Sequence, residues 1–109
     1  MSQQNDSLKT LQTTIAARRH ADPADSYVAS LFNKGRDKIA RKVAEEGLEV
    51  AIAAISEGRA RVISESADLL FHLLVLCEHE GIAFAEIVDE LASREGVSGL
   101  EEKASRGKS

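Results

Sequence analysis

Apolar side chains recur every three or four residues along most of the chain, which is the spacing of amphipathic helices. Turn signals at Asp22-Pro23, Gly35, Gly58 and Gly81 divide this pattern into successive segments. The pattern predicts helices over about residues 7–20, 25–33, 37–57, 62–79 and 84–94. Ser7 is the expected N-cap of the first helix. In the second helix, the residues expected to be buried are Tyr27, Val28, Leu31 and Phe32.

Short gaps between long helices favour antiparallel neighbours, so the predicted fold is an all-α bundle. The segments 37–57 and 62–79 should form its central hairpin. The second of them is apolar on almost every side from Leu69 to Leu76. A helix of that kind needs cover all round, which one hairpin in so small a chain cannot provide. We therefore expect a homodimer or a higher oligomer.

Composition narrows the class of protein. The chain has 109 residues and a net charge of −4, which suits one domain and argues against a nucleic-acid partner. We expect a domain over residues 1–95 and a loose polar tail over 96–109, rich in Gly, Ser and charge. The polar N-terminus has no signal-peptide core, and the longest apolar run is too short to cross a membrane. A single cysteine, Cys77, favours a reduced compartment, so the expected location is the cytoplasm.

Acidic residues occupy positions where a helical core is expected. The third predicted helix contains Glu45, Glu46 and Glu49, and the fourth contains Glu65 and Asp68. On a helical rotation measured from Ile39, Glu46 lies about 20° away and Glu49 about 80° away, inside or beside the apolar stripe. Glu65 and Asp68 share a face with His72, next to apolar neighbours.

An antiparallel hairpin turning at Gly58 would bring the two acid pairs level. Glu49 precedes Gly58 by nine residues and Asp68 follows it by ten, and the helical rise makes that difference small. Four carboxylates around one partly dry cavity repel each other and lose hydration, and a divalent cation relieves both costs. Oxygen-only ligands favour Mg²⁺, with Mn²⁺ as a substitute.

Basic residues cluster just before these acids along the chain, and Arg94 lies toward the C-terminal end. A metal-bridged polyphosphate would use both charges, so we expect contacts to substrate from Lys34, Arg36, Lys38, Lys42 and Arg94. Other interpretations stay open. The acids could form a solvated face, with Lys42 paired to Glu45 or Glu46, in a non-catalytic helical interaction module. His72 is more often a satisfied core histidine than a ligand. A di-iron bundle is disfavoured because such sites use Glu-x-x-His.

The acid pattern resembles that of the all-α nucleotide pyrophosphohydrolases, the MazG-like superfamily. Neighbouring stretches are similar to the phosphoribosyl-ATP pyrophosphohydrolase family of histidine biosynthesis, from about Leu8 to Arg94. The specific stretches are residues 26–31, Lys34-Gly35, residues 38–43 and residues 67–76.

The resemblance implies a cytoplasmic homodimer that hydrolyses phosphoribosyl-ATP to phosphoribosyl-AMP and pyrophosphate with Mg²⁺, the second step of that pathway. It also implies that the metal ligands are Glu46, Glu49, Glu65 and Asp68. Glu45 is a candidate to orient or deprotonate water, and Glu46 and Glu49 are the other expected catalytic residues. His72 is a further candidate to hold substrate. A housekeeping pyrophosphohydrolase acting on free nucleoside triphosphates is the nearest alternative function.

Overall fold

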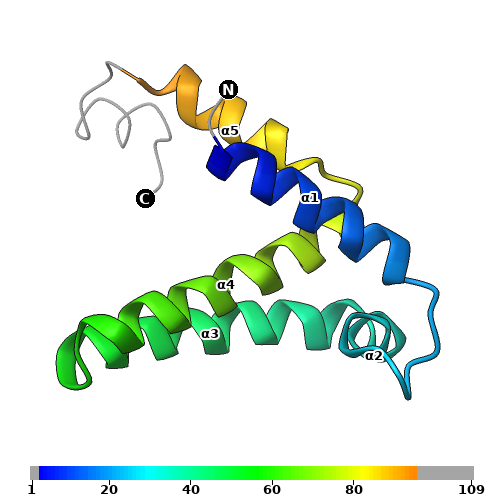
Figure 1. Cartoon of the computed structure of the whole chain (residues 1–109), viewed down its shortest axis with the longest axis horizontal. Coiled ribbons are helices and arrows are strands. Elements are labelled where there is room, and N and C mark those ends of the chain that lie inside the picture. The colour runs from blue at the N-terminus through cyan, green and yellow to red at the C-terminus, as the bar shows by residue number, and fades with distance from the viewer. Residues whose placement is uncertain (1–2, 96–109) are drawn as a thin grey trace.

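The computed structural model describes residues 3–95, all of whose regular structure is helical, as predicted. The elements are α1 (Gln3–Arg18), α2 (Tyr27–Lys34), α3 (Arg36–Ser56), α4 (Arg59–Glu80) and α5 (Phe84–Ser93). Figure 1 shows α3 and α4 side by side, with α1 and α5 lying together on the other side of the molecule. The predicted tail over residues 96–109 lies outside the described residues.

The hairpin of α3 and α4 is the framework of the molecule, and the two helices run antiparallel (Figure 1). The turn between them is tight because Gly58 has a φ of 97°, a left-handed conformation that suits glycine. The backbone N–H groups of Glu57 and Gly58 both donate to the carbonyl of Ala53 at 2.9 Å, which ends α3. The chain therefore reverses within two residues, and the middles of α3 and α4 face each other.

The hydrophobic core lies where α1 and α2 meet the first half of α3 and the last half of α4. Its buried residues are Ile15, Val28, Leu31, Ile39, Leu74 and Val75. The side chain of Gln12 ties α1 to the loop after α4, since it donates to the carbonyl of Ile82 at 3.1 Å and accepts from the N–H of Phe84 at 3.0 Å. The half of the hairpin nearest Gly58 has little core of its own, and Ala53 is its buried apolar residue among those described.

The helix ends correct two sequence predictions. Ser7 lies inside α1, which begins at Gln3, because nothing in the polar N-terminal segment breaks a helix. The second helix begins at Tyr27, two residues later than predicted, because the Ser26 side chain accepts from the N–H of Ala29 and caps it.

Tyr27 is 53% exposed, so the prediction that it is buried is wrong. At the first position of α2 its ring packs beside Phe71 while its hydroxyl bonds to His72. Val28 and Leu31 are buried as predicted. Within residues 3–95, no helix combines the length and hydropathy that a membrane span requires.

Candidate active site

Three predicted metal ligands lie together between α3 and α4. Each of Glu46, Glu65 and Asp68 offers a carboxylate oxygen, and these oxygens all lie within 4.8 Å of one another. Glu46 comes from the middle of α3, while Glu65 and Asp68 lie one turn apart on α4. The antiparallel hairpin thus brings residues from two chain segments into one group, which we call the acid cluster.

The acid cluster is only partly compensated by neighbouring cations. The Lys42 Nζ lies 3.4 Å from Glu46 Oε2 and 3.6 Å from Glu45 Oε1. The Arg61 guanidinium bonds to Glu65, whose side chain is 8% exposed. Within the described part of the chain, the exposed carboxylate of Asp68 has no cationic partner. The cluster therefore keeps negative charge that a cation could neutralise.

Lys42 is held as a charged ammonium at the edge of this cluster. Its partial burial alone would lower its pKa. Coulombic interaction with Tyr27, together with the hydrogen bond and negative charge of Glu46 and the negative charge of Glu45, outweighs the effect of burial, so the pKa of Lys42 is raised from its ordinary value. Lys42 thus stays positive at every physiological pH.

His72 is a buried histidine with both ring nitrogens bonded, in keeping with the interpretation of a satisfied core residue. It is 5% exposed, and its Nδ1 lies 2.7 Å from the backbone carbonyl oxygen of Asp68. Its Nε2 lies 2.9 Å from the hydroxyl of Tyr27. His72 is therefore one turn beyond the acid cluster and connects α4 to the start of α2.

The other predicted site residues lie around the cluster or away from it. Glu49 is exposed on α3 and lies outside the three-residue cluster, and Glu45 is exposed and paired to Lys42. Lys34 is exposed at the end of α2, and Lys38 is half-buried in the first turn of α3. Arg36 bonds to Glu80 at 2.8 Å, and Arg94 bonds to Glu90 at 3.0 Å beyond α5. The structure thus brings Lys42 to the acids and holds Arg36 and Arg94 against other carboxylates.

Sequence reasoning missed two residues at this site. Arg61 bonds to Glu65 and also lies 3.7 Å from Glu57, and the four-residue spacing of these three residues is a signal that could have indicated it. The sequence signal for Tyr27 is weaker, because an aromatic residue next to apolar neighbours is usually interpreted as part of the core. Its hydroxyl gave the only sign of a polar partner.

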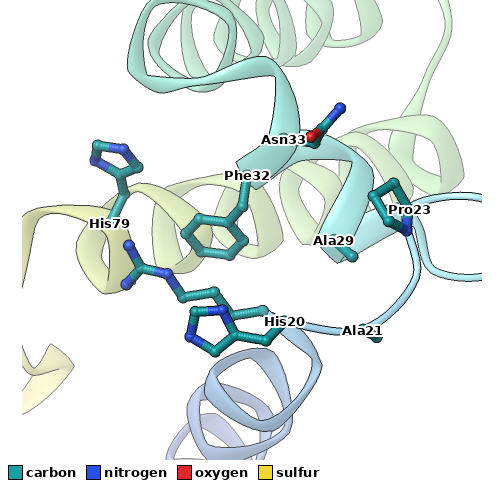
Figure 2. A pocket seen from close by; sticks show the side chains of 8 residues that line it. His20, Ala21, Pro23, Ala29, Phe32, Asn33 and His79 are labelled. Atoms are coloured by element: carbon teal, nitrogen blue, oxygen red, sulfur yellow. The ribbon is translucent and has the colours of Figure 1, made fainter.

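A separate hollow of 310 Å³ lies between the end of α1, α2 and the end of α4. Figure 2 shows the Phe32 ring at its centre, with His79 and His20 on different sides of it. The Arg19 guanidinium carbon lies 4.6 Å from the Phe32 ring centre, and the same guanidinium bonds to Glu78. The lining residues are Arg19, His20, Ala21, Pro23, Ala29, Phe32, Asn33 and His79, none of them a predicted site residue.

Carboxylates facing each other on two antiparallel helices, in the order Glu-Glu-x-x-Glu and Glu-x-x-Asp, are the pattern of the all-α nucleotide pyrophosphohydrolases. The fold and the acid cluster agree with that class of enzyme. The sequence profile of phosphoribosyl-ATP pyrophosphohydrolase matches residues 8–95. The chain belongs to the phosphoribosyl-ATP pyrophosphohydrolase family, whose members are hydrolases acting on a phosphoric anhydride.

Similar proteins from several bacteria have the matching name. A phosphoribosyl-ATP pyrophosphatase of Rhizorhabdus wittichii is 56% identical over 101 residues, which cover 93% of this chain and 95% of the relative. One from Novosphingobium aromaticivorans is 54% identical, covering 91% of this chain and 92% of the relative. One from Paramagnetospirillum magneticum is 49% identical, covering 99% of both chains. The similarity therefore extends over nearly the whole length.

Proposed function

We propose that this chain hydrolyses phosphoribosyl-ATP to phosphoribosyl-AMP and pyrophosphate, in the histidine pathway. The observation that carries the proposal is the acid cluster of Glu46, Glu65 and Asp68, with Lys42 beside it. The names of relatives about half identical over nearly the full length supply the substrate. Residues 1–95 would form the catalytic domain, in keeping with the family match over residues 8–95.

Mg²⁺ is the proposed cofactor, and the donor set fits it. Three carboxylate oxygens within 4.8 Å of one another, with no cysteine or histidine among them, are hard ligands suited to Mg²⁺ or Mn²⁺. Glu46, Glu65 and Asp68 would hold the ion, and the exposed Glu49, one turn after Glu46, would complete the set. When bound, the ion would neutralise phosphate charge and make a bound water more acidic.

The chain's own residues would bind the polyphosphate and orient the attacking water. Water adds to the α-phosphorus, the bond from that phosphorus to the bridging oxygen breaks, and pyrophosphate leaves. Glu45 is exposed beside the cluster and would orient this water or accept its proton. Lys42 would contact phosphate oxygens, and Lys34 and Lys38 lie in neighbouring turns where they could extend the positive surface. Arg36 and Arg94 would first have to leave Glu80 and Glu90.

The test is pyrophosphate release from phosphoribosyl-ATP, measured against a panel of ordinary nucleoside triphosphates, each with and without Mg²⁺. The proposal predicts Mg²⁺-dependent release with phosphoribosyl-ATP as the preferred substrate by kcat/KM. Preference for free nucleoside triphosphates would support a housekeeping pyrophosphohydrolase instead. No release from any nucleotide, together with no Mg²⁺-dependent change in melting temperature, would support the helical interaction module.

A homodimer is the proposed assembly, and the cytoplasm the proposed location. Leu48, Ile52 and Ile55 form an exposed apolar stripe on α3, and Ile63 and Leu70 form another on α4. The radius of gyration is 15.9 Å, whereas a compact chain of this length has about 13 Å. A second copy would cover these stripes, and the dimer would have a more compact shape than the single chain. The unpaired thiol of Cys77 suits a reducing compartment.

A further inference from the structure

The hollow between the end of α1, α2 and the end of α4 lies well away from the acid cluster. On α4, His79 follows Asp68 by eleven residues, which is about three helical turns, or about 16 Å along the axis. The volume of the hollow, 310 Å³, is at the lower end of the range for small-molecule sites. The proposed chemistry at the acid cluster makes no use of the residues that line it.

Arg19 is fixed in the wall of this hollow with part of its guanidinium unused. Its Nη1 donates to the backbone carbonyl of Glu78 at 3.2 Å and lies 3.4 Å from Glu78 Oε2. The guanidinium carbon lies over the Phe32 ring, 4.6 Å from its centre. Among residues 3–95, the structure shows no partner for Nε or Nη2. These two nitrogens form the edge of a guanidinium that binds two oxygens of a phosphate or carboxylate side by side.

Two histidines supply further polar groups on different sides of the Phe32 ring (Figure 2). The His79 ring is stacked with Phe32, with ring centres 6.1 Å apart and planes 10° apart, and its Nδ1 lies 3.0 Å from Glu80 Oε2. Glu80 is also bonded to Arg36, so its charge is compensated. His20 is exposed, and no described residue bonds to its ring. The Nε2 of His79 and both ring nitrogens of His20 therefore remain for a ligand.

The rest of the wall is largely apolar and includes Phe32, Pro23 and Ala29. An apolar wall beside unused nitrogens suits a ligand that has both an oxyanion and a carbon skeleton. Nitrogens from three side chains suit the three terminal oxygens of a phosphomonoester better than the two of a carboxylate. We propose that this hollow binds a sugar phosphate, with its phosphate held by Arg19 and the two histidines and its sugar carbons against Phe32.

The sugar phosphate has two possible sources. Phosphoribosyl-ATP contains a ribose 5-phosphate end besides its triphosphate, and His79 lies within about 20° of Asp68 around α4, on the same side of the helix. The substrate's phosphoribosyl end would then occupy the hollow while its triphosphate lies at the acid cluster. The other source is a free sugar phosphate that binds as a separate ligand. The first source rests on the proposed function, whereas the sugar-phosphate site itself does not.

The direct test is a nuclear magnetic resonance titration of the full chain with ribose 5-phosphate, without metal, following the rings of its three histidines. The resonances of His20 and His79 should shift saturably, while that of the buried His72 should not. Ribose should cause no shift because it lacks the phosphate, and inorganic phosphate should bind more weakly because it lacks the carbon skeleton. No saturable shift of His20 and His79 would overturn the proposal.

Three variants test which side chains hold the phosphate. Arg19→Gln should weaken ribose 5-phosphate binding at least about tenfold, the effect of losing hydrogen bonds from a charged group. His20→Ala changes an exposed residue, so the fold should be retained, and binding should weaken about threefold. The matched control is Arg18→Gln, an exposed arginine at the end of α1 outside the hollow, which should leave the Kd unchanged. Equal Kd values in wild type, Arg19→Gln and His20→Ala would show that these residues serve packing alone and would overturn the proposal.

Kinetics with Mg²⁺ distinguish the two sources. If the substrate's phosphoribosyl end occupies the hollow, Arg19→Gln should raise the KM for phosphoribosyl-ATP at least about tenfold and leave the KM for ATP unchanged. Ribose 5-phosphate should then inhibit competitively. If a free sugar phosphate is the ligand, both KM values should stay the same while ribose 5-phosphate binding is weakened. A wild-type protein inactive on phosphoribosyl-ATP would overturn the proposed function, whereas the titration would still decide whether the hollow binds a sugar phosphate.

Discussion

At the scale of single residues, the three acids of the cluster are compensated in different ways. Glu46 has Lys42, Glu65 has Arg61, and Asp68 has no cationic partner among the described residues. The sequence predicted these acids because spacings of three and four on a helix determine a shared face. It could not predict the exposure of Tyr27, which depends on His72 and Phe71, forty or more residues away.

Asp68→Asn should separate stability from activity. Removing the uncompensated charge relieves repulsion from Glu46 and Glu65, so the melting temperature without metal should rise or stay the same. Pyrophosphate release should fall on the order of 100-fold, as expected when one electrostatic group of an active site is lost. Thermal unfolding without metal tests the predicted melting temperature, and steady-state kinetics tests the predicted loss of activity. Unaltered kinetics would show that Asp68 is not part of the active site.

Cys77 gives a prediction for high pH. Burial, followed by the negative charge of Glu86, raises the pKa of this thiol above its ordinary value of 9.0. The unfolded chain therefore releases the thiol proton first, and the free energy of unfolding should fall as the pH rises above about 9. Chemical unfolding of wild type and Cys77→Ala between pH 8 and pH 10.5 measures the difference in slope. Equal slopes would contradict the raised pKa.

At the scale of elements, α2 shows what local sequence determines and what it leaves open. The apolar residues Val28 and Leu31 predicted a helix and its buried face, and both are buried. The start of the helix depended on which polar residue caps it, and two nearby aspartates, Asp22 and Asp25, compete with Ser26 for that role. Asp22 accepts from the N–H of Ala24 instead, which leaves the cap to Ser26.

Ser26→Ala should destabilise the protein by about 1 kcal/mol, the usual cost of losing an N-cap side chain. Ser26→Asn retains an acceptor at the cap and should keep most of the stability. Urea unfolding measures the stability, and equal stability of both variants would show that the cap contributes little.

At the scale of the whole molecule, the short turn at Gly58 predicted the hairpin of α3 and α4. No feature of the sequence predicted the placement of α1 across α4. That placement depends on long-range contacts such as Gln12 with Ile82 and Arg19 with Glu78, which no local pattern specifies. The excess of apolar residues on α4 predicted that a single chain would leave apolar surface uncovered. The structure locates much of the uncovered apolar surface, at Leu48 and Ile55 of α3, which are 60% and 84% exposed.

Leu48→Glu should therefore shift the proposed dimer toward monomer, because it puts a charge into the apolar stripe. The matched control is Leu91→Glu on α5, where the leucine is 63% exposed against 60% for Leu48. Sedimentation velocity should show a lower mass for Leu48→Glu alone, with helical circular dichroism retained. A wild-type monomer, or the same mass for Leu48→Glu and wild type, would contradict the proposed interface.

We propose that Glu46, Glu65 and Asp68 together hold a hard divalent cation, and the proposed chemistry depends on this binding. Its most direct test is a Mn²⁺ titration followed by electron paramagnetic resonance, in which the signal of free Mn²⁺ disappears on binding. Wild type should bind Mn²⁺ saturably, Mg²⁺ should compete for the site, and Glu46→Gln and Asp68→Asn should bind at least about tenfold more weakly. No saturable binding, or equal affinity in wild type and both variants, would contradict it.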